Sequence, residues 1–154
     1  MKRTLFFIVL CLSALAIHAQ QYIDLGLPSG TLWMNQNQEG GFNGFYTYEE
    51  ALLDFGDQLP TRAQFQELMD KCQWKWTGKG YQVTGPNGNS IFLPPVGFRL
   101  CDSTTESVGL YGDYWTSTPG DYEHAWSLYC LSGRYGLGTV SRCSGRSVRL
   151  VKNL

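Results

Sequence analysis

The chain has few charged residues, only two histidines and no Cys-x-x-Cys pair, and each of these shortages narrows its possible functions. Lys, Arg, Asp and Glu make up 16% of the 154 residues, and the formal net charge is −1. This near-neutral balance argues against nucleic acid as a bulk electrostatic partner. The absence of closely spaced cysteine pairs disfavours metal binding and redox chemistry by cysteine. We therefore expect no metal and no cofactor.

No hydrophobic run is long enough to cross a bilayer, because a spanning helix takes about 20 residues. The apolar stretch at the start runs only from Leu5 to Ile17, after Lys2 and Arg3. A charged start, a short apolar core and a small residue at its exit are typical of a secretory signal peptide. We expect residues 1–19 to be a signal peptide and residues 20–154 to form one exported domain, located in the periplasm, at the cell surface or outside the cell.

The charge of the expected mature chain is unevenly distributed. Loss of Lys2 and Arg3 leaves 10 basic and 13 acidic residues, a net charge of −3. Yet the stretch from Ser132 to Arg149 holds four arginines and neither Asp nor Glu. A local basic surface near the C-terminus is therefore expected.

Aromatic residues at 14% and 18 glycines are typical of a compact, loop-rich domain that contains β-structure. Four cysteines follow the expected cleavage point: Cys72, Cys101, Cys130 and Cys143. In an oxidising compartment this even number permits two disulfides, in any of three pairings.

Turn and capping signals divide the chain into elements. Residues 22–25 and 31–35 flank a Pro-Ser-Gly turn and predict a hairpin, and the polar residues 38–43 predict a loop. Two Thr-x-x-Glu/Gln capping boxes predict helices over 48–55 and 62–72. Apolar runs between glycine-rich turns predict strands over 81–84, 90–93, 114–118, 124–131, 139–143 and 147–152.

In the strand predicted over 124–131, alternation places Trp126, Leu128 and Cys130 on one face, which we expect to point inward. Strands joined by short turns must be antiparallel. The order of strands, helices and further strands predicts an α+β fold with two helices, antiparallel sheets and long loops.

Several short motifs, in this order along the chain, resemble those of the Fibrobacter succinogenes major paralogous domain family. They are residues 22–33 (YIDLGLPSGTLW), 59–68 (LPTRAQFQEL), 72–76 (CQWKW), 91–94 (IFLP), 114–118 (YWTST) and 147–151 (SVRLV). The resemblance implies a C-type lectin-like fold and a secreted or surface protein of Bacteroidetes-type bacteria, in a family that mostly has no established activity. It therefore supplies a fold more securely than a function.

The same fold is used by calcium-dependent lectins and by formylglycine-generating enzymes, and we compare the chain with both. The lectin motifs place carboxylates around calcium, whereas this chain has Gly85-Pro86-Asn87 and Tyr114-Trp115-Thr116 at the matching places. The enzymes need a reactive cysteine pair, for which Cys130 and Cys143 lie at the right end of the chain. The chain has no recognisable flanking motif of those enzymes, so oxidase activity is an unfavoured alternative.

A hydrolytic site is also disfavoured. After the expected cleavage His124 is the remaining histidine, beside Asp121 and Glu123, and a lone histidine at a strand start is more often solvated than catalytic. We therefore expect no enzyme.

The C-terminal basic segment offers aromatic, guanidinium and hydroxyl groups, from which interfaces draw much of their binding energy. We predict a ligand-binding surface formed by Tyr129, Arg134, Tyr135, Arg142 and Arg146, with an anionic glycan or an acidic protein as partner. An ordinary solvated hairpin with solubilising charges is the alternative. The predicted function is thus a non-catalytic binding module.

Two further hypotheses remain open. Residues 127–146 contain no Lys, Glu, Gln, Met or Trp, as expected if adenine-directed mutation by a retroelement had diversified this segment, as in variable proteins with the same fold. A structural subunit of a surface assembly is the other hypothesis, since short strands leave sheet edges that can pair.

Overall fold

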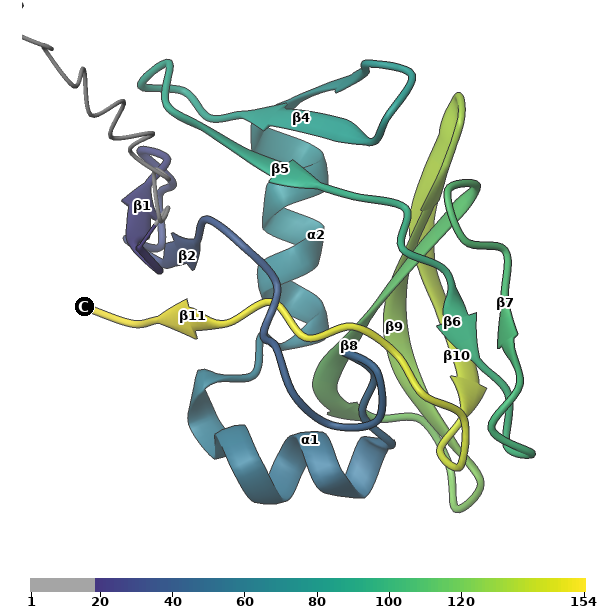
Figure 1. Ribbon diagram of the computed structural model, residues 1–154. Helices are drawn as coiled ribbons and strands as arrows, with labels where there is room; N and C mark the ends of the chain where they lie inside the picture. Colours follow the sequence, from purple (N-terminus) through teal and green to yellow (C-terminus); the bar gives the residue numbers. More distant parts are fainter. Residues whose placement is uncertain (1–18) are drawn as a thin grey trace, which may run out of the picture.

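The structure is a computed structural model that describes residues 19–154, so the expected signal peptide lies outside the described residues except for Ala19. The described chain is a mixed α+β domain (Figure 1). Its elements are β1 (Tyr22–Asp24), β2 (Leu32–Met34), α1 (Tyr48–Phe55), the 3-10 helix η1 (Gly56–Gln58), α2 (Arg62–Lys71), β3 (Gln73–Trp76), β4 (Tyr81–Thr84), β5 (Ser90–Leu93), β6 (Phe98–Arg99), β7 (Thr105–Glu106), β8 (Tyr111–Pro119), β9 (His124–Leu131), β10 (Arg134–Ser141) and β11 (Val151–Lys152). None of the helices in this part of the chain is long and apolar enough to span a membrane.

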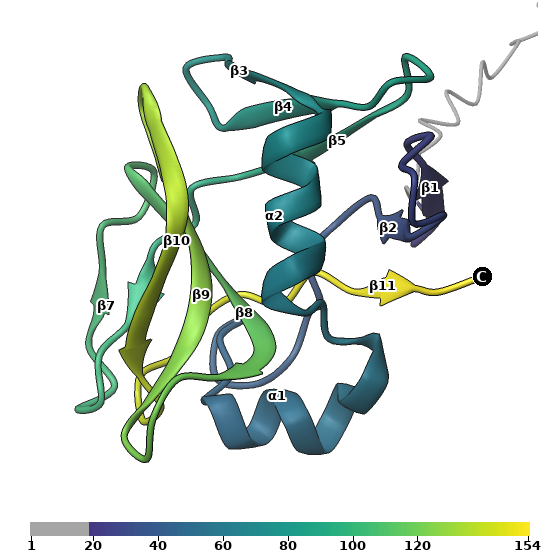
Figure 2. The ribbon, with the colours of Figure 1, turned by 180° about the vertical axis from the view of Figure 1, so that it is seen from behind.

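The strands form small antiparallel sheets around α2. The largest has the order β10-β9-β8, and two others have the orders β3-β4-β5 and β1-β2-β11. Figure 2 shows α2 at the centre, with the β8–β9–β10 sheet on one side and β1, β2 and β11 on the other. Phe65 and Leu68 of α2 are fully buried in a core to which all three sheets contribute. The face of α2 that carries Phe65 and Leu68 is therefore a core face.

Both helices begin where their capping boxes predict. The Thr47 side chain accepts a hydrogen bond from the backbone of Glu50, while the Glu50 carboxylate accepts one from the Thr47 backbone. Thr61 and Gln64 make the same exchange at the start of α2. These reciprocal bonds satisfy backbone donors that the first helical turn would otherwise leave unpaired.

Both predicted hairpins are confirmed, with β1 paired to β2 and β4 to β5. Strand β10 is longer than the predicted 139–143 and begins at Arg134, because its ladder with β9 continues through Gly136 and Gly138. Glycine lowers strand propensity, so the sequence hides this part of the strand. Where the sequence predicts a strand over 147–152, only Val151–Lys152 is paired as a strand, and Ser147 makes an isolated parallel bridge to Tyr114.

The prediction that Trp126, Leu128 and Cys130 face the core is correct for two of the three side chains. Leu128 and Cys130 are fully buried, whereas Trp126 is only half-buried and lies under the guanidinium of Arg62, 3.8 Å from the ring centroid. Ala125 and Ser127, on the other face of β9, are also buried. Buried side chains therefore lie on both faces of β9, with half-buried ones between them.

Candidate functional site

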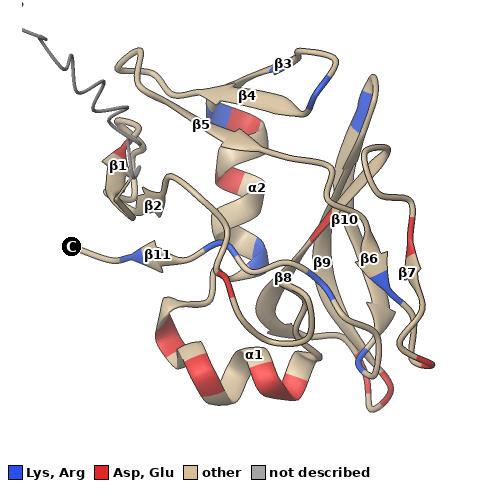
Figure 3. Ribbon diagram, viewed as in Figure 1, with Lys and Arg blue, Asp and Glu red and all other residues tan. Residues whose placement is uncertain are grey.

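The five residues of the ligand-binding surface predicted from the sequence do not form one face. Arg134 and Arg142 stand at opposite ends of β10, roughly 26 Å apart at about 3.3 Å per residue. Figure 3 shows basic positions at the tip of the β9–β10 hairpin, at its other end and along the segment that leads into β11. The local basic surface expected from the sequence is therefore dispersed.

Arg146 lies in the interior, which corrects its expected exposure. Its Nε atom is 2.6 Å from a carboxylate oxygen of Asp113, and the two side chains are 8% and 1% exposed. Burial raises the pKa of Asp113 to about 6, and the nearby Arg146 guanidinium opposes that rise. Arg146 therefore neutralises an internal acid and is not available to a ligand at the surface.

Arg142 is largely engaged within the fold. Its guanidinium donates hydrogen bonds to the backbone oxygens of Asp121 and His124, lies 3.6 Å from Glu49 and covers the ring of Tyr48. These contacts join the end of β10 to α1 and to the β8–β9 turn. The arginine thus connects three segments of the chain.

Tyr129 and Arg134 lie together, whereas Tyr135 points to the other face of the sheet. Tyr129 is paired with Gly136 across the β9–β10 ladder, and the Arg134 guanidinium stands 5.7 Å from the Tyr129 ring centroid. Tyr135 stacks on Trp74, with ring centroids 4.2 Å apart. Of the predicted set, the structure therefore brings together only the half-buried Tyr129 and the exposed Arg134 as one aromatic and cationic pair.

One of the two disulfides that the cysteine count permits is present, between Cys101 and Cys143. Cys72 and Cys130 are free, and burial raises the pKa of Cys72 to about 11 and that of Cys130 to about 12. The reactive Cys130–Cys143 pair that the oxidase alternative requires is therefore not assembled: one sulfur is bonded to Cys101 and the other is a buried thiol.

Reduction of the Cys101–Cys143 disulfide is expected to lower the free energy of unfolding by about 2–4 kcal/mol. The bond closes a loop with a sequence separation of 42, and opening it returns conformational entropy to the unfolded chain. Urea denaturation with and without reductant measures the loss. The Cys72→Ala variant is the control and should lose the same amount on reduction; a loss below 1 kcal/mol would contradict the expectation.

His124 and the acids of α1 occupy solvated positions. The His124 ring Nδ1 is 2.9 Å from Asp121, and both side chains are exposed. Among the described residues no group of three or more His, Cys, Asp or Glu side chains is arranged to hold a metal ion.

A pocket of about 700 Å3 lies beside the loop between β2 and α1, and we call it the loop pocket. One wall is the polar loop of residues 35–44, and the other is apolar and comes from β5, the segment after it and the segment before β8. Its lining residues are Asn35, Gln36, Asn37, Gln38, Glu39, Gly40, Asn43, Gly44, Phe45, Phe92, Pro94, Val96, Thr105, Val108, Ser147 and Arg149.

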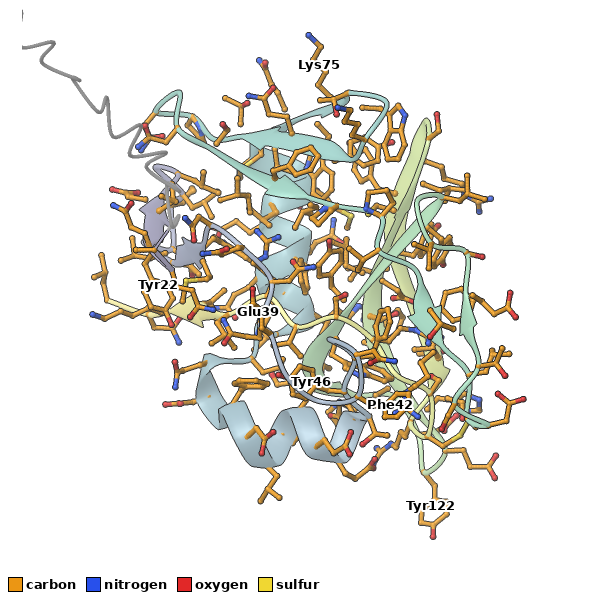
Figure 4. The ribbon with its side chains drawn as sticks, in the orientation of Figure 1. Tyr22, Glu39, Phe42, Tyr46, Lys75 and Tyr122 are labelled. Carbon is orange, nitrogen blue, oxygen red and sulfur yellow. A yellow bond between two sulfur atoms is a disulfide. The ribbon has the colours of Figure 1, made fainter. Side chains whose placement is uncertain are left out.

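Backbone hydrogen bonds fix the polar wall to the C-terminal segment. The Met34 and Gln38 amides donate to the carbonyls of Leu150 and Val148, and Tyr46 exchanges two bonds with Arg146. The Tyr46 hydroxyl also donates to the Glu39 carbonyl, and Figure 4 shows these two residues with Phe42 along the loop, in front of β8. The loop is thus anchored at both ends by contacts within the fold.

Arg149 stands behind this wall and is fully buried. Its guanidinium donates to the side-chain oxygen of Asn37 and to the backbone oxygens of Met34 and Phe92. Burial lowers the pKa of Arg149 to about 10, so the group remains protonated at neutral pH. Arg149 therefore joins the polar loop to β5 and places a buried positive charge at the pocket.

Two buried polar atoms of pocket residues have no hydrogen-bond partner, the side-chain nitrogen of Gln38 and the hydroxyl of Ser147. Both atoms are buried away from solvent, so they do not bear on what the pocket binds. The pocket residues were not predicted as a site from the sequence. The feature that could have indicated a polar site is the run of four consecutive amide side chains from Asn35 to Gln38, next to a glycine-rich loop.

No family model, curated protein or solved structure matches this chain in the three comparisons made with known proteins.

Proposed function

We propose that the chain is an exported, non-catalytic binding module with a C-type lectin-like fold, and that it holds its ligand in the loop pocket. The motifs that resemble the Fibrobacter succinogenes major paralogous domain family and the α+β arrangement support the fold. The Cys101–Cys143 disulfide is compatible with export, because such bonds persist in oxidising compartments.

The formed pocket is the observation that carries this proposal. Ligand sites are usually concave, largely pre-formed and lined by apolar groups with a few placed polar ones. The loop pocket has this composition, with Phe92, Pro94 and Val96 opposite the amides of residues 35–38. Its volume is within the range of about 300–1,000 Å3 that small-ligand pockets occupy.

Placing a large side chain in the loop pocket should weaken ligand binding without disturbing the fold. Val108 lines the pocket and is 66% exposed, so Val108→Trp is expected to place an indole in it and to weaken binding by about tenfold or more. The measurement is binding of the purified protein to arrays of saccharides and extracellular proteins, followed by titration of the hits.

Leu110→Trp is the matched control, because Leu110 is 72% exposed, close in sequence and outside the pocket lining. It should bind as the unmodified protein does. Equal binding by both variants would exclude the loop pocket as the site, and an unmodified protein that binds nothing on the arrays would contradict the binding-module proposal.

The pair of the half-buried Tyr129 and the exposed Arg134 supports a second candidate, an anion-binding surface on the β8–β9–β10 sheet. Arg134 is exposed and contacts the Tyr129 ring, an arrangement that presents both a guanidinium and an aromatic face. This is the remainder of the surface predicted from the sequence. The pocket lining contains no residue of the segment 127–146, so the hypothesis of retroelement diversification concerns this second surface.

A further inference from the structure

We infer that the loop pocket is a site for an anionic saccharide, in which a carboxylate or sulfate group lies near the amide of Asn37. This inference rests on the proposed function and adds the class of ligand. It follows from a buried positive charge that no internal acid balances, and from a pocket with one polar and one apolar wall.

The charge of Arg149 has no carboxylate partner among residues 19–154. Its hydrogen bonds go to amide and carbonyl oxygens, and the groups that act on its charge are the hydroxyl of Tyr114 and the thiol of Cys130. Asp113, the buried acid of this region, is paired with Arg146. The guanidinium of Arg149 is thus a buried cation held only by neutral dipoles.

A buried cation of this kind favours an anion in the adjoining pocket. Charges interact more strongly near a low-dielectric interior than in water, and a cleft with one sign of uncompensated charge concentrates ligands of the opposite sign. Asn37 and the fully buried Arg149 both belong to the pocket wall, and the Asn37 side-chain oxygen accepts two of the guanidinium hydrogen bonds. The guanidinium therefore acts through its field and through the fixed orientation of this amide.

The remaining wall chemistry fits the hydroxyl-bearing part of a saccharide. Side-chain amides both donate and accept hydrogen bonds, and residues 35–38 of the polar wall each carry one. Phe92, which is 38% exposed, offers an aromatic face for the apolar side of a sugar ring. The two walls together fit a ligand that has both hydroxyl groups and an apolar ring face.

Glu39 is the one carboxylate among the residues that line the pocket, and it is exposed at the rim. Its negative charge opposes an anion, but water and salt screen an exposed charge far more than a buried one. Glu39→Gln is therefore expected to strengthen anion binding by about twofold to fivefold.

The decisive variant is Asn37→Asp, which supplies the missing acid. It keeps the side-chain shape and the oxygen that accepts from Arg149, but it replaces the amide nitrogen beside the buried Tyr114 hydroxyl, so circular dichroism and the unfolding temperature check that the fold is retained. The probes are an oligogalacturonate, its neutral methyl ester and a sulfated galactan oligosaccharide, titrated by calorimetry at low and moderate salt. The unmodified protein should bind a charged probe at least about tenfold more tightly than the ester, and Asn37→Asp should lose that preference.

Two more variants locate the effect. Lys75→Ala makes the same change in net charge as Asn37→Asp, at an exposed position that points away from the molecule in Figure 4, and should leave binding unchanged. Arg134→Ala distinguishes the two surfaces. If Arg134→Ala loses binding of the charged probes and Asn37→Asp keeps it, the inference is overturned in favour of the Tyr129–Arg134 surface.

The other possible results test the inference as well. Comparing the oligogalacturonate with the sulfated galactan shows whether the site prefers a carboxylate or a sulfate group. Equal binding of the acid and the ester, abolished by Val108→Trp, would overturn the anion inference while the proposed binding function stands. Failure of all three saccharides to bind, or binding of hexa-aspartate in their place, would overturn the assignment to saccharides. Retention of charged-probe binding by Val108→Trp would contradict the proposed site itself.

Discussion

Replacing Arg146 by methionine is expected to lower the free energy of unfolding by about 3–5 kcal/mol. The substitution leaves the carboxyl group of Asp113 buried without its cation, and breaking one side of a buried ion pair costs this much because the remaining charge cannot regain water. Equilibrium urea denaturation at pH 7 measures the change. The result separates a structural arginine from a ligand-binding one.

Two comparisons make the Arg146 experiment specific. Arg134→Ala removes an exposed guanidinium from the same segment and should change stability by no more than about 0.5 kcal/mol. Replacing Arg146 and Asp113 together by methionine and leucine should recover much of the loss, since a buried pair can often be exchanged for apolar side chains at little cost. A loss below 1 kcal/mol in Arg146→Met would show that the pair is not a determinant of stability.

Trp115→Ala is expected to destabilise the protein by a similar amount, about 3–5 kcal/mol, because it removes a large side chain from a packed core. Trp115 is fully buried, its ring contacts Tyr48 edge to face at 5.4 Å, and its indole nitrogen donates a 2.7 Å hydrogen bond to the Tyr46 carbonyl. The loss should appear as a lower midpoint of urea unfolding.

The contributions of packing and hydrogen bonding in this core can be separated. Trp115→Phe retains much of the aromatic volume but removes one of the two hydrogen bonds that the Tyr46 carbonyl accepts, since the Arg146 amide still donates to it, so it should cost less than the alanine variant. Leu53→Ala on α1, where the side chain is 86% exposed, is the control and should change stability by about 0.5 kcal/mol at most. A Trp115→Ala protein as stable as this control would contradict the assigned packing.

The elements with strong local signals could be predicted from the sequence. Both helices start at capping boxes, and the β4–β5 hairpin forms around a turn in which Gly88 has a positive φ of 87°. Where pairing depends on tertiary contacts the prediction was weaker. The first half of β10 contains two glycines and is held in the sheet by its ladder with β9, and the two-residue strands β6 and β7 have too few residues to show a pattern.

The candidate site was less predictable, because the roles of the arginines depend on what surrounds them. Four arginines in one stretch suggested a single basic face, but Arg146 pairs with an acid 33 positions earlier and Arg149 bonds Asn37, 112 positions earlier. Neither partner can be found from local spacing. The pocket walls likewise come from segments that meet only after α2 and the sheets have packed.

The separation between the loop pocket and the β9–β10 hairpin has an evolutionary consequence. Sequence change in one of the two regions alters no residue that lines the other. With the two proposed binding surfaces, a lineage could exchange its partner on the hairpin side while keeping an inherited ligand in the pocket, or the reverse. Selection would then act on two largely independent traits carried by one small scaffold.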